Sequence, residues 1–234
     1  MYDTQRRLAS IIAVTVGLGF VLGVLVNQLW KDNGLAVEKS ANQKVMGTFA
    51  QITAVAADSN TAHKAIVAGF GELYRVERLM SYHDANSEVS AVNRQAFSEP
   101  VRVSGDTFAV VAEAVKWYRL SGGSFDVTVG PLVDLWKQAG KTNQMPDVNA
   151  IALAESKVGS DKLILDANQL TIKFKVDGMR IDLGAIAKGY SVDLAVAAMK
   201  KAGAKGGLVV AGGDLRYFIH SPQPLSVSPN IGSQ

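Results

Sequence analysis

The sequence predicts an α+β fold: a single domain in which an antiparallel sheet packs against helices, preceded by one N-terminal transmembrane helix. Three observations lead to this class. The 234 residues are 48% hydrophobic, which is enough for a packed core. Segments with helical periodicity and segments with strand-like alternation succeed one another, and two hairpin-like stretches interrupt this order. Finally, one long apolar run without charges stands apart near the N-terminus.

This apolar run extends from Leu8 to Val26 and is long enough to cross a bilayer as a helix. Arg6 and Arg7 precede it, so the positive-inside rule leaves the amino end in the cytoplasm. A cleavable signal peptide is the alternative, because small residues at 34–36 have suitable spacing, but the run is longer than a usual signal core. We therefore expect residues 1–30 to be an uncleaved anchor in the bacterial inner membrane, with the rest in the periplasm.

Charge and cysteine content narrow the function classes. The formal net charge is +3, and Arg6, Arg7 and Lys31 less Asp3 account for +2 of it, so the body carries only about +1. This balance gives no argument for a nucleic-acid partner. The chain has no cysteine, which excludes an N-terminal lipid on cysteine, structural disulfides and thiol chemistry. A serine hydrolase is also disfavoured, because no G-x-S-x-G elbow is present.

A polar linker over residues 31–43 leads to the main domain, expected over residues 44–220 and followed by an irregular tail at 221–234. Residues 44–57 alternate well enough to predict one strand, and Asp58 or Ser59 can cap the helix that follows. A polar stretch at 81–93 then interrupts the pattern. Ser104 is a plausible cap for a helix over 105–120, which Gly122 and Gly123 end.

The C-terminal half contains shorter elements. Asp177-Gly178 is the residue pair that a type I′ hairpin turn favours. In chain order, the sequence predicts an extended piece that becomes helical near Pro131, and then a short helix over 147–158. A hairpin over 162–176 and a second hairpin continuing into 179–183 follow. The last elements are a helix ending near Ala202 and two strands between 206 and 218.

The stretch RIDLGAIAKGYSVD, at 180–193, contains an aspartate, a glycine and a lysine between a predicted strand and a predicted helix. Unpaired backbone N–H groups and the helix dipole make such a junction a ready anion site, and Lys188 in the first turn could reach a phosphate. From spacing alone a tight turn with a solvated Lys188 is favoured, because the stretch matches neither the P-loop nor the G-x-G-x-x-G pattern.

Two further motifs place glycines beside aspartates. In GGSFDVTVGPLVDLW, at 122–136, Asp126 lies in an apolar run and needs a partner, either as a turn cap or as part of a site. In VVAGGDLRYF, at 209–218, Gly212 and Gly213 precede Asp214, where a ligand could approach closely but where simple strand-to-turn punctuation is the commoner cause.

Taken together, five ordered motifs make the chain resemble the ApbE family, the FAD:protein FMN transferases. They are MGT at 46–48, MSYHDANSEVSAVN at 80–93, GGSFDVTVGPLVDLW, IDLGAIAKGYSVD at 181–193 and LVVAGGDLR at 208–216. The resemblance implies an ApbE-like, T-fold-like domain that binds FAD and Mg²⁺, attaches FMN to a threonine of an acceptor protein by a phosphoester bond, and releases AMP. The acceptor threonine would lie in a D-G-x-T type sequence.

The resemblance also implies roles for particular residues, and it reverses the interpretation of residues 180–193 as a plain turn. Met46 would line the flavin site and Tyr82 would pack on a ring of FAD. Ala185 would bind Mg²⁺ through its backbone carbonyl. The residues expected to contact the dinucleotide are Ser124, Phe125, Asp126, Asp182 and Lys188, and the last two are also the expected catalytic residues.

One departure from the family pattern leaves alternatives open. The family's other Mg²⁺ ligands are an aspartate and a threonine well beyond the G-G-D motif, whereas no Asp, Glu or Thr follows Asp214 here. We therefore expect a C-terminally incomplete transferase domain. The alternatives are a catalytically silent, membrane-tethered FAD-binding protein, or an FAD pyrophosphatase that yields FMN and AMP.

Overall fold

The structure is a computed structural model that describes residues 34–219. Over this range the fold is α+β, with antiparallel sheets and packed helices, as the sequence predicts. Between residues 34 and 219, no helix combines the length and apolarity needed to cross a membrane. The predicted anchor at Leu8 to Val26 and the predicted tail at 221–234 lie outside the described residues.

The larger sheet has five strands in the described range, in the order β1-β3-β7-β8, with β2 also paired to β3. All its pairings are antiparallel. Side chains alternate along β3, so that Ala50, Ile52 and Ala54 face the interior. The strands are β1 (Ala36–Lys39), β2 (Gln43–Val45), β3 (Thr48–Ala56), β7 (Gly206–Ala211) and β8 (Asp214–Ile219).

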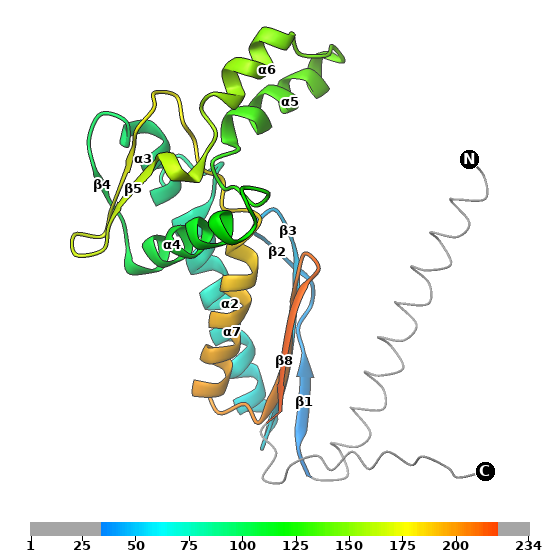
Figure 1. Ribbon diagram of the computed structural model, residues 1–234. Coiled ribbons are helices and arrows are strands. Elements are labelled where there is room, and N and C mark those ends of the chain that lie inside the picture. The colour runs from blue at the N-terminus through cyan, green and yellow to red at the C-terminus, as the bar shows by residue number, and fades with distance from the viewer. Residues whose placement is uncertain (1–33, 220–234) are drawn as a thin grey trace, which may run out of the picture.

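Helices α2 (Ser59–Met80) and α7 (Ala187–Lys201) run side by side over one face of this sheet (Figure 1). Asp58 caps α2 by accepting a hydrogen bond from the backbone N–H of Thr61 at 2.8 Å, which confirms one of the two predicted caps. The buried residues between these helices and the sheet are called the first core and include Ile52, Ala62, Phe70, Leu73, Val196 and Met199.

A smaller sheet, in the order β4-β6-β5, lies with α3 and α4 at one end of the α2 and α7 pair (Figure 1). Its buried residues form a second core with the C-terminal end of α2; they include Val76, Met80, Val89, Ile172, Phe174 and Ile181. The elements are α3 (Glu88–Gln95), β4 (Val101–Arg102), α4 (Gly105–Leu120), the 3₁₀ turn η1 (Ser160–Lys162), β5 (Leu163–Asp166) and β6 (Thr171–Phe174). Ser104 caps α4, as predicted, through the N–H of Thr107.

Helices α5 (Gly130–Thr142) and α6 (Val148–Glu155) pack against each other and project from the body of the fold (Figure 1). Pro131 lies in the first turn of α5, where its missing N–H costs nothing. Asp147 caps α6 through the N–H of Asn149 at 2.8 Å. Only Gly130 of α5 and Ala154 of α6 are buried, so this pair depends on few contacts with the rest of the molecule.

The structure corrects the strand predicted over residues 44–57. A two-residue turn at Met46 and Gly47 divides it into β2 and β3, with Val45 opposite Thr48. The φ angles of Met46 and Gly47 are 53° and 71°, which is the left-handed conformation that a type I′ hairpin turn requires at both central residues. The alternation of apolar residues continues through the turn, so the sequence pattern alone did not reveal that the strand is interrupted.

The second predicted hairpin, across Asp177-Gly178, is also wrong. Gly178 has a φ of 75° but Asp177 is not in the left-handed region, and residues 179–183 form no strand. Arg180 makes only an isolated parallel bridge with Val129. Two elements were missed: α3 lies in the stretch expected to be polar and irregular, and β1 lies in the range expected to be a linker.

Candidate functional site

A cavity of about 250 Å³ lies between the C-terminal end of α2, the β2–β3 turn and the segment that leads into α7. Met46 packs against both cores, so the cavity is located where they meet. Cavities at such junctions are common ligand sites. The structure brings together four of the predicted site residues, because Met46, Tyr82, Asp182 and Lys188 all line this cavity.

Asp182 is held by two hydrogen bonds, one made by its backbone N–H and one by its side chain. Its N–H donates to the carbonyl of Val127 at 2.8 Å, and its Oδ1 accepts from the N–H of Gly184 at 2.9 Å. These bonds hold Asp182 in a segment that belongs to neither sheet. The carboxylate is partly exposed and lies at the wall of the cavity.

Lys188 is the second residue of α7, in the first turn as predicted. Its Nζ donates to the carbonyl of Gly184, and within residues 34–219 no carboxylate forms an ion pair with it. No side chain caps the first turn of α7 either. A positive charge and the N-terminal end of a helix dipole therefore lie together at the cavity, an arrangement that favours a phosphate.

Tyr82 is held by a charged pair from two other segments. Its hydroxyl donates to Oδ2 of Asp134 at 2.7 Å, and a guanidinium nitrogen of Arg180 forms an ion pair with the same oxygen at 2.8 Å. The guanidinium carbon of Arg180 is 5.0 Å from the centre of the Tyr82 ring, and the ammonium of Lys137 is 5.3 Å from it. Burial raises the pKa of the Tyr82 hydroxyl, and the hydrogen bond to Asp134 raises it further, so Tyr82 stays protonated.

A second cavity, of about 480 Å³, adjoins the first, because Tyr82 and His83 line both. It extends from Tyr82 toward α3 and the loop before Arg180. Tyr82 therefore lies between two neighbouring cavities, and together these cavities leave room for an elongated ligand.

Ser124, Phe125 and Asp126 do not line the first cavity. Ser124 is exposed, and Phe125 packs against the second core. Oδ1 of Asp126 accepts hydrogen bonds from both the N–H and the hydroxyl of Thr128 and from the hydroxyl of Ser160, at 2.7–2.8 Å. This loop nevertheless borders the site, because the next residue, Val127, accepts the hydrogen bond from Asp182.

The expected metal site is incomplete in the described range. Ala185 is exposed in the turn before α7. Across residues 34–219, no group of three or more His, Asp and Glu side chains could hold a metal ion. Within the described range, the carbonyl of Ala185 is therefore the one expected ligand for Mg²⁺, an ion that prefers octahedral oxygen coordination and keeps several waters.

Two polar residues at the site were missed because they act on backbone groups. Asn93 donates from its amide nitrogen to the carbonyl of Ile181 at 2.9 Å and accepts from the N–H of Ile181 at 2.7 Å, so it fixes the residue before Asp182. Glu77 lines the cavity and accepts from the N–H of Met46 at 2.7 Å. Asn93 is the last residue of the motif at 80–93, and Glu77 could have been noticed as an acid in the last turn of a helix.

Comparison with known proteins adds the following findings. The family model described as ApbE family matches residues 46–228. Two curated relatives named FAD:protein FMN transferase are 31% identical over 187 residues (Haemophilus influenzae; 76% of this chain and 53% of the relative) and 33% identical over 146 residues (Vibrio cholerae; 62% and 43%).

Solved structures agree with this match. The flavin transferase ApbE from Vibrio cholerae is 30% identical with a TM-score of 0.67, covering 77% of this chain and 59% of that one. The ApbE protein from Thermotoga maritima is 28% identical with a TM-score of 0.69, covering 80% and 60%. The chain spans about half the length of the first curated relatives that it matches.

Proposed function

This chain belongs to the ApbE family, and from that membership we propose that it is an FAD:protein FMN transferase. It takes FMN from FAD, attaches it to a threonine of an acceptor protein by a phosphoester bond, and releases AMP. One observation carries the proposal: Met46, Tyr82, Asp182 and Lys188, which come from three separate motifs, line one cavity. The acceptor threonine is proposed to lie in a D-G-x-T type sequence.

In this proposal the ring system of FAD lies against Met46 and Tyr82, and the pyrophosphate lies at the N-terminal end of α7. Lys188 and the helix dipole stabilise the negative charge on the phosphate oxygens. Ser124, Phe125 and Asp126 contact the dinucleotide from the bordering loop. Such positioning and charge stabilisation are the main protein contributions to phosphoryl transfer.

The transfer step forms a bond between the threonine oxygen and the phosphorus of the FMN half. It breaks the bond from that phosphorus to the bridging oxygen, and AMP leaves with that oxygen. The threonine proton must be removed, and we assign Asp182 as the base, since its carboxylate lies at the cavity wall. We also propose that the carbonyl of Ala185 would be one ligand of a Mg²⁺ ion. No bond or proton in the step above depends on that ion.

The proposed location is the inner membrane, with the catalytic domain in the periplasm. Support comes from the apolar run at Leu8 to Val26 and the two arginines before it. Cell fractionation with protease access to spheroplasts tests this: a chain protected from external protease, or one released with the soluble fraction, would contradict the assignment.

The test of function mixes the full chain in detergent with FAD, Mg²⁺ and an acceptor domain that carries a D-G-x-T sequence, and weighs the acceptor by intact-mass spectrometry. We expect an FMN-sized gain in mass. Asp182→Asn and Lys188→Ala should slow transfer roughly ten- to a hundredfold, because each removes a charged contact to the reacting groups. Lys201→Ala, an exposed lysine in the last turn of α7, is the matched control and should leave the rate unchanged.

A silent FAD-binding protein is the second candidate. The same experiment separates the possibilities by product. Bound FAD with no mass gain and no free FMN indicates the silent protein, and free FMN with AMP indicates a pyrophosphatase. Wild-type transfer by both Asp182→Asn and Lys188→Ala would remove the site assignment.

A further inference from the structure

The turn at Met46 and Gly47 has an unfavourable sequence for its geometry. A two-residue type I′ turn places both central residues at positive φ, and Asn-Gly is the pair that tolerates this best. Here the first position is methionine, with a φ of 53°. Non-glycine residues in this region are uncommon, and they persist where surrounding contacts impose them, often at functional sites.

The backbone N–H of Met46 is hydrogen-bonded to Glu77. Its Oε1 accepts from the N–H of Met46 at 2.7 Å, across 31 residues of sequence. Glu77 lies in the last turn of α2, where the negative end of the helix dipole disfavours a carboxylate. Two locally unfavourable features, a methionine at positive φ and an acid at a helix C-terminus, therefore meet in one hydrogen bond.

That hydrogen bond lies in the wall of the cavity proposed to bind FAD. Met46, Gly47 and Glu77 line it together with Asp182 and Lys188. The Met46 side chain also packs against both cores, so a shift of the turn would move a wall of the cavity relative to the end of α7. Glu77 is therefore hydrogen-bonded to the backbone of this wall.

We propose that Glu77 is a positioning residue: by holding the Met46 N–H it fixes the turn against which FAD packs, and so it sets the affinity for FAD more than the rate of transfer. This inference rests on the proposed function. It differs from a catalytic role because the bonded oxygen of Glu77 faces a backbone amide.

The test compares Glu77→Ala with Glu77→Gln in the full chain, by titrating FAD and following flavin fluorescence, and by measuring KM and kcat for transfer. Glu77→Ala should weaken FAD binding roughly tenfold, the equilibrium factor of one ordinary hydrogen bond, with kcat at saturating FAD nearly unchanged. Glu77→Gln keeps a carbonyl oxygen as acceptor and should restore most of the affinity. Glu99→Ala, an exposed acid outside the cavity, is the control.

A second pair of variants asks whether the effect passes through the turn. Asparagine tolerates the left-handed region, so Met46→Asn should hold the turn without help from Glu77. In the Met46→Asn background, the further change Glu77→Ala should therefore alter the Kd for FAD much less than it does in the wild type. An equal effect in both backgrounds would show that Glu77 does not act through Met46 and would overturn the proposal.

The remaining outcomes are equally decisive. A wild-type Kd in Glu77→Ala overturns the positioning role while leaving the proposed function intact. If Glu77→Gln is as weak as Glu77→Ala, the negative charge itself contacts the ligand and the proposal is wrong. If the wild type binds no FAD, the proposed function fails and the inference fails with it.

Discussion

At the scale of single residues, the carboxylate of Asp126 joins two segments that are far apart in sequence. Oδ1 accepts the two bonds from Thr128 and the bond from the Ser160 hydroxyl, and Oδ2 accepts a longer one, 3.3 Å, from the Ser160 N–H. Thr128 and Ser160 are almost fully buried. Thr128 in turn accepts from the N–H of Gly159 at 2.7 Å, so Asp126 and the Thr128 hydroxyl together join the two segments.

We expect Asp126→Ala to lower the free energy of unfolding by about 2–4 kcal/mol, because it leaves buried hydroxyl and N–H groups without partners. Asp166→Ala is the matched control: Asp166 accepts from the N–H groups of Asn168 and Gln169, which are exposed and can bond to water instead. Its loss should stay below about 1 kcal/mol. Urea denaturation followed by circular dichroism measures both, and equal losses would contradict the argument.

Part of the site could be predicted because some of its residues have recognisable side-chain chemistry. Tyr82, Asp182 and Lys188 stand in motifs whose residue types reveal their chemistry. Glu77 and Asn93 act on backbone N–H and C=O groups, and every residue carries such groups, so nothing in the sequence of their partners indicates the contact. Asp134 bonds a side chain instead, and its role appears only when α5 brings it to Tyr82.

Among helices and strands, those stabilised by contacts close in sequence were predicted correctly, and a segment with distant partners was not. Helices α2 and α4 were predicted with their caps, and α6 was predicted as a short helix, because a cap and an apolar period are local signals. Residues 179–183 were misassigned because their partners are remote: Val127 and Val129 lie on one side and Asn93 on the other. An apolar run shows that a segment is buried and extended, but not which segment it pairs with.

The start of α5 presses against this same segment at Gly130. A Cβ added to Gly130 would lie 2.7 Å from both the carbonyl oxygen and the Cβ of Arg180. We expect Gly130→Ala to destabilise the fold by about 1–3 kcal/mol through overpacking, and to displace Arg180 from Tyr82. Thermal or chemical denaturation measures the stability.

Gly140 provides the control within the same helix, because an added Cβ there meets nothing within 4 Å. Gly140→Ala should raise the free energy of unfolding by about 0.5–1 kcal/mol, since alanine is the better helix former. Helix propensity alone would not explain why the same glycine-to-alanine change lowers the free energy of unfolding at one position of α5 and raises it at the other. Stabilisation by Gly130→Ala would show that the close approach to Arg180 is not a constraint.

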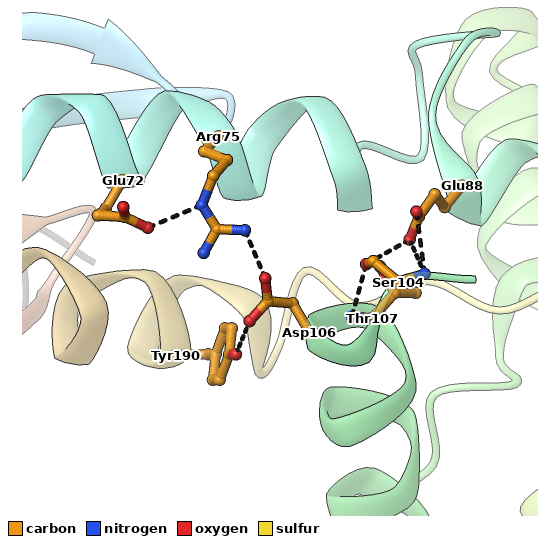
Figure 2. A network of polar contacts seen from close by, with 7 residues as sticks. All are labelled: Glu72, Arg75, Glu88, Ser104, Asp106, Thr107 and Tyr190. Atoms are coloured by element: carbon orange, nitrogen blue, oxygen red, sulfur yellow. Dashed lines mark hydrogen bonds and ion pairs between the residues drawn. The ribbon is translucent and has the colours of Figure 1, made fainter. Parts of the chain in front are cut away.

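At the scale of the whole molecule, a polar network joins helices α2, α4 and α7 (Figure 2). Asp106, at the start of α4, accepts from Arg75 of α2 and from the Tyr190 hydroxyl of α7, and Arg75 also pairs with Glu72 at 2.8 Å. The sticks in Figure 2 show the Asp106 carboxylate between its two donors. Three helices are therefore fixed to one another at a single carboxylate.

This network predicts how stability depends on pH. The hydrogen bond from Tyr190 lowers the pKa of Asp106, and Arg75 lowers it further. A carboxyl whose folded pKa is depressed contributes stability above its unfolded pKa of about 3.9, and that contribution is lost as the pH falls through the lower folded pKa. Asp106→Asn should thus be less stable than the wild type at neutral pH, and the two should converge in acid.

The difference between the two proteins isolates Asp106, because the other carboxylates titrate alike in both and cancel. Urea unfolding at a series of pH values from 7 to the acid limit would measure it. Tyr190→Phe removes the larger cause of the lowered Asp106 pKa, so the stability that Asp106 retains through Arg75 should disappear at a higher pH than in the wild type. A stability difference between wild type and Asp106→Asn that did not change with pH would mean that packing of the side chain, rather than its charge, joins α4 to α2 and α7.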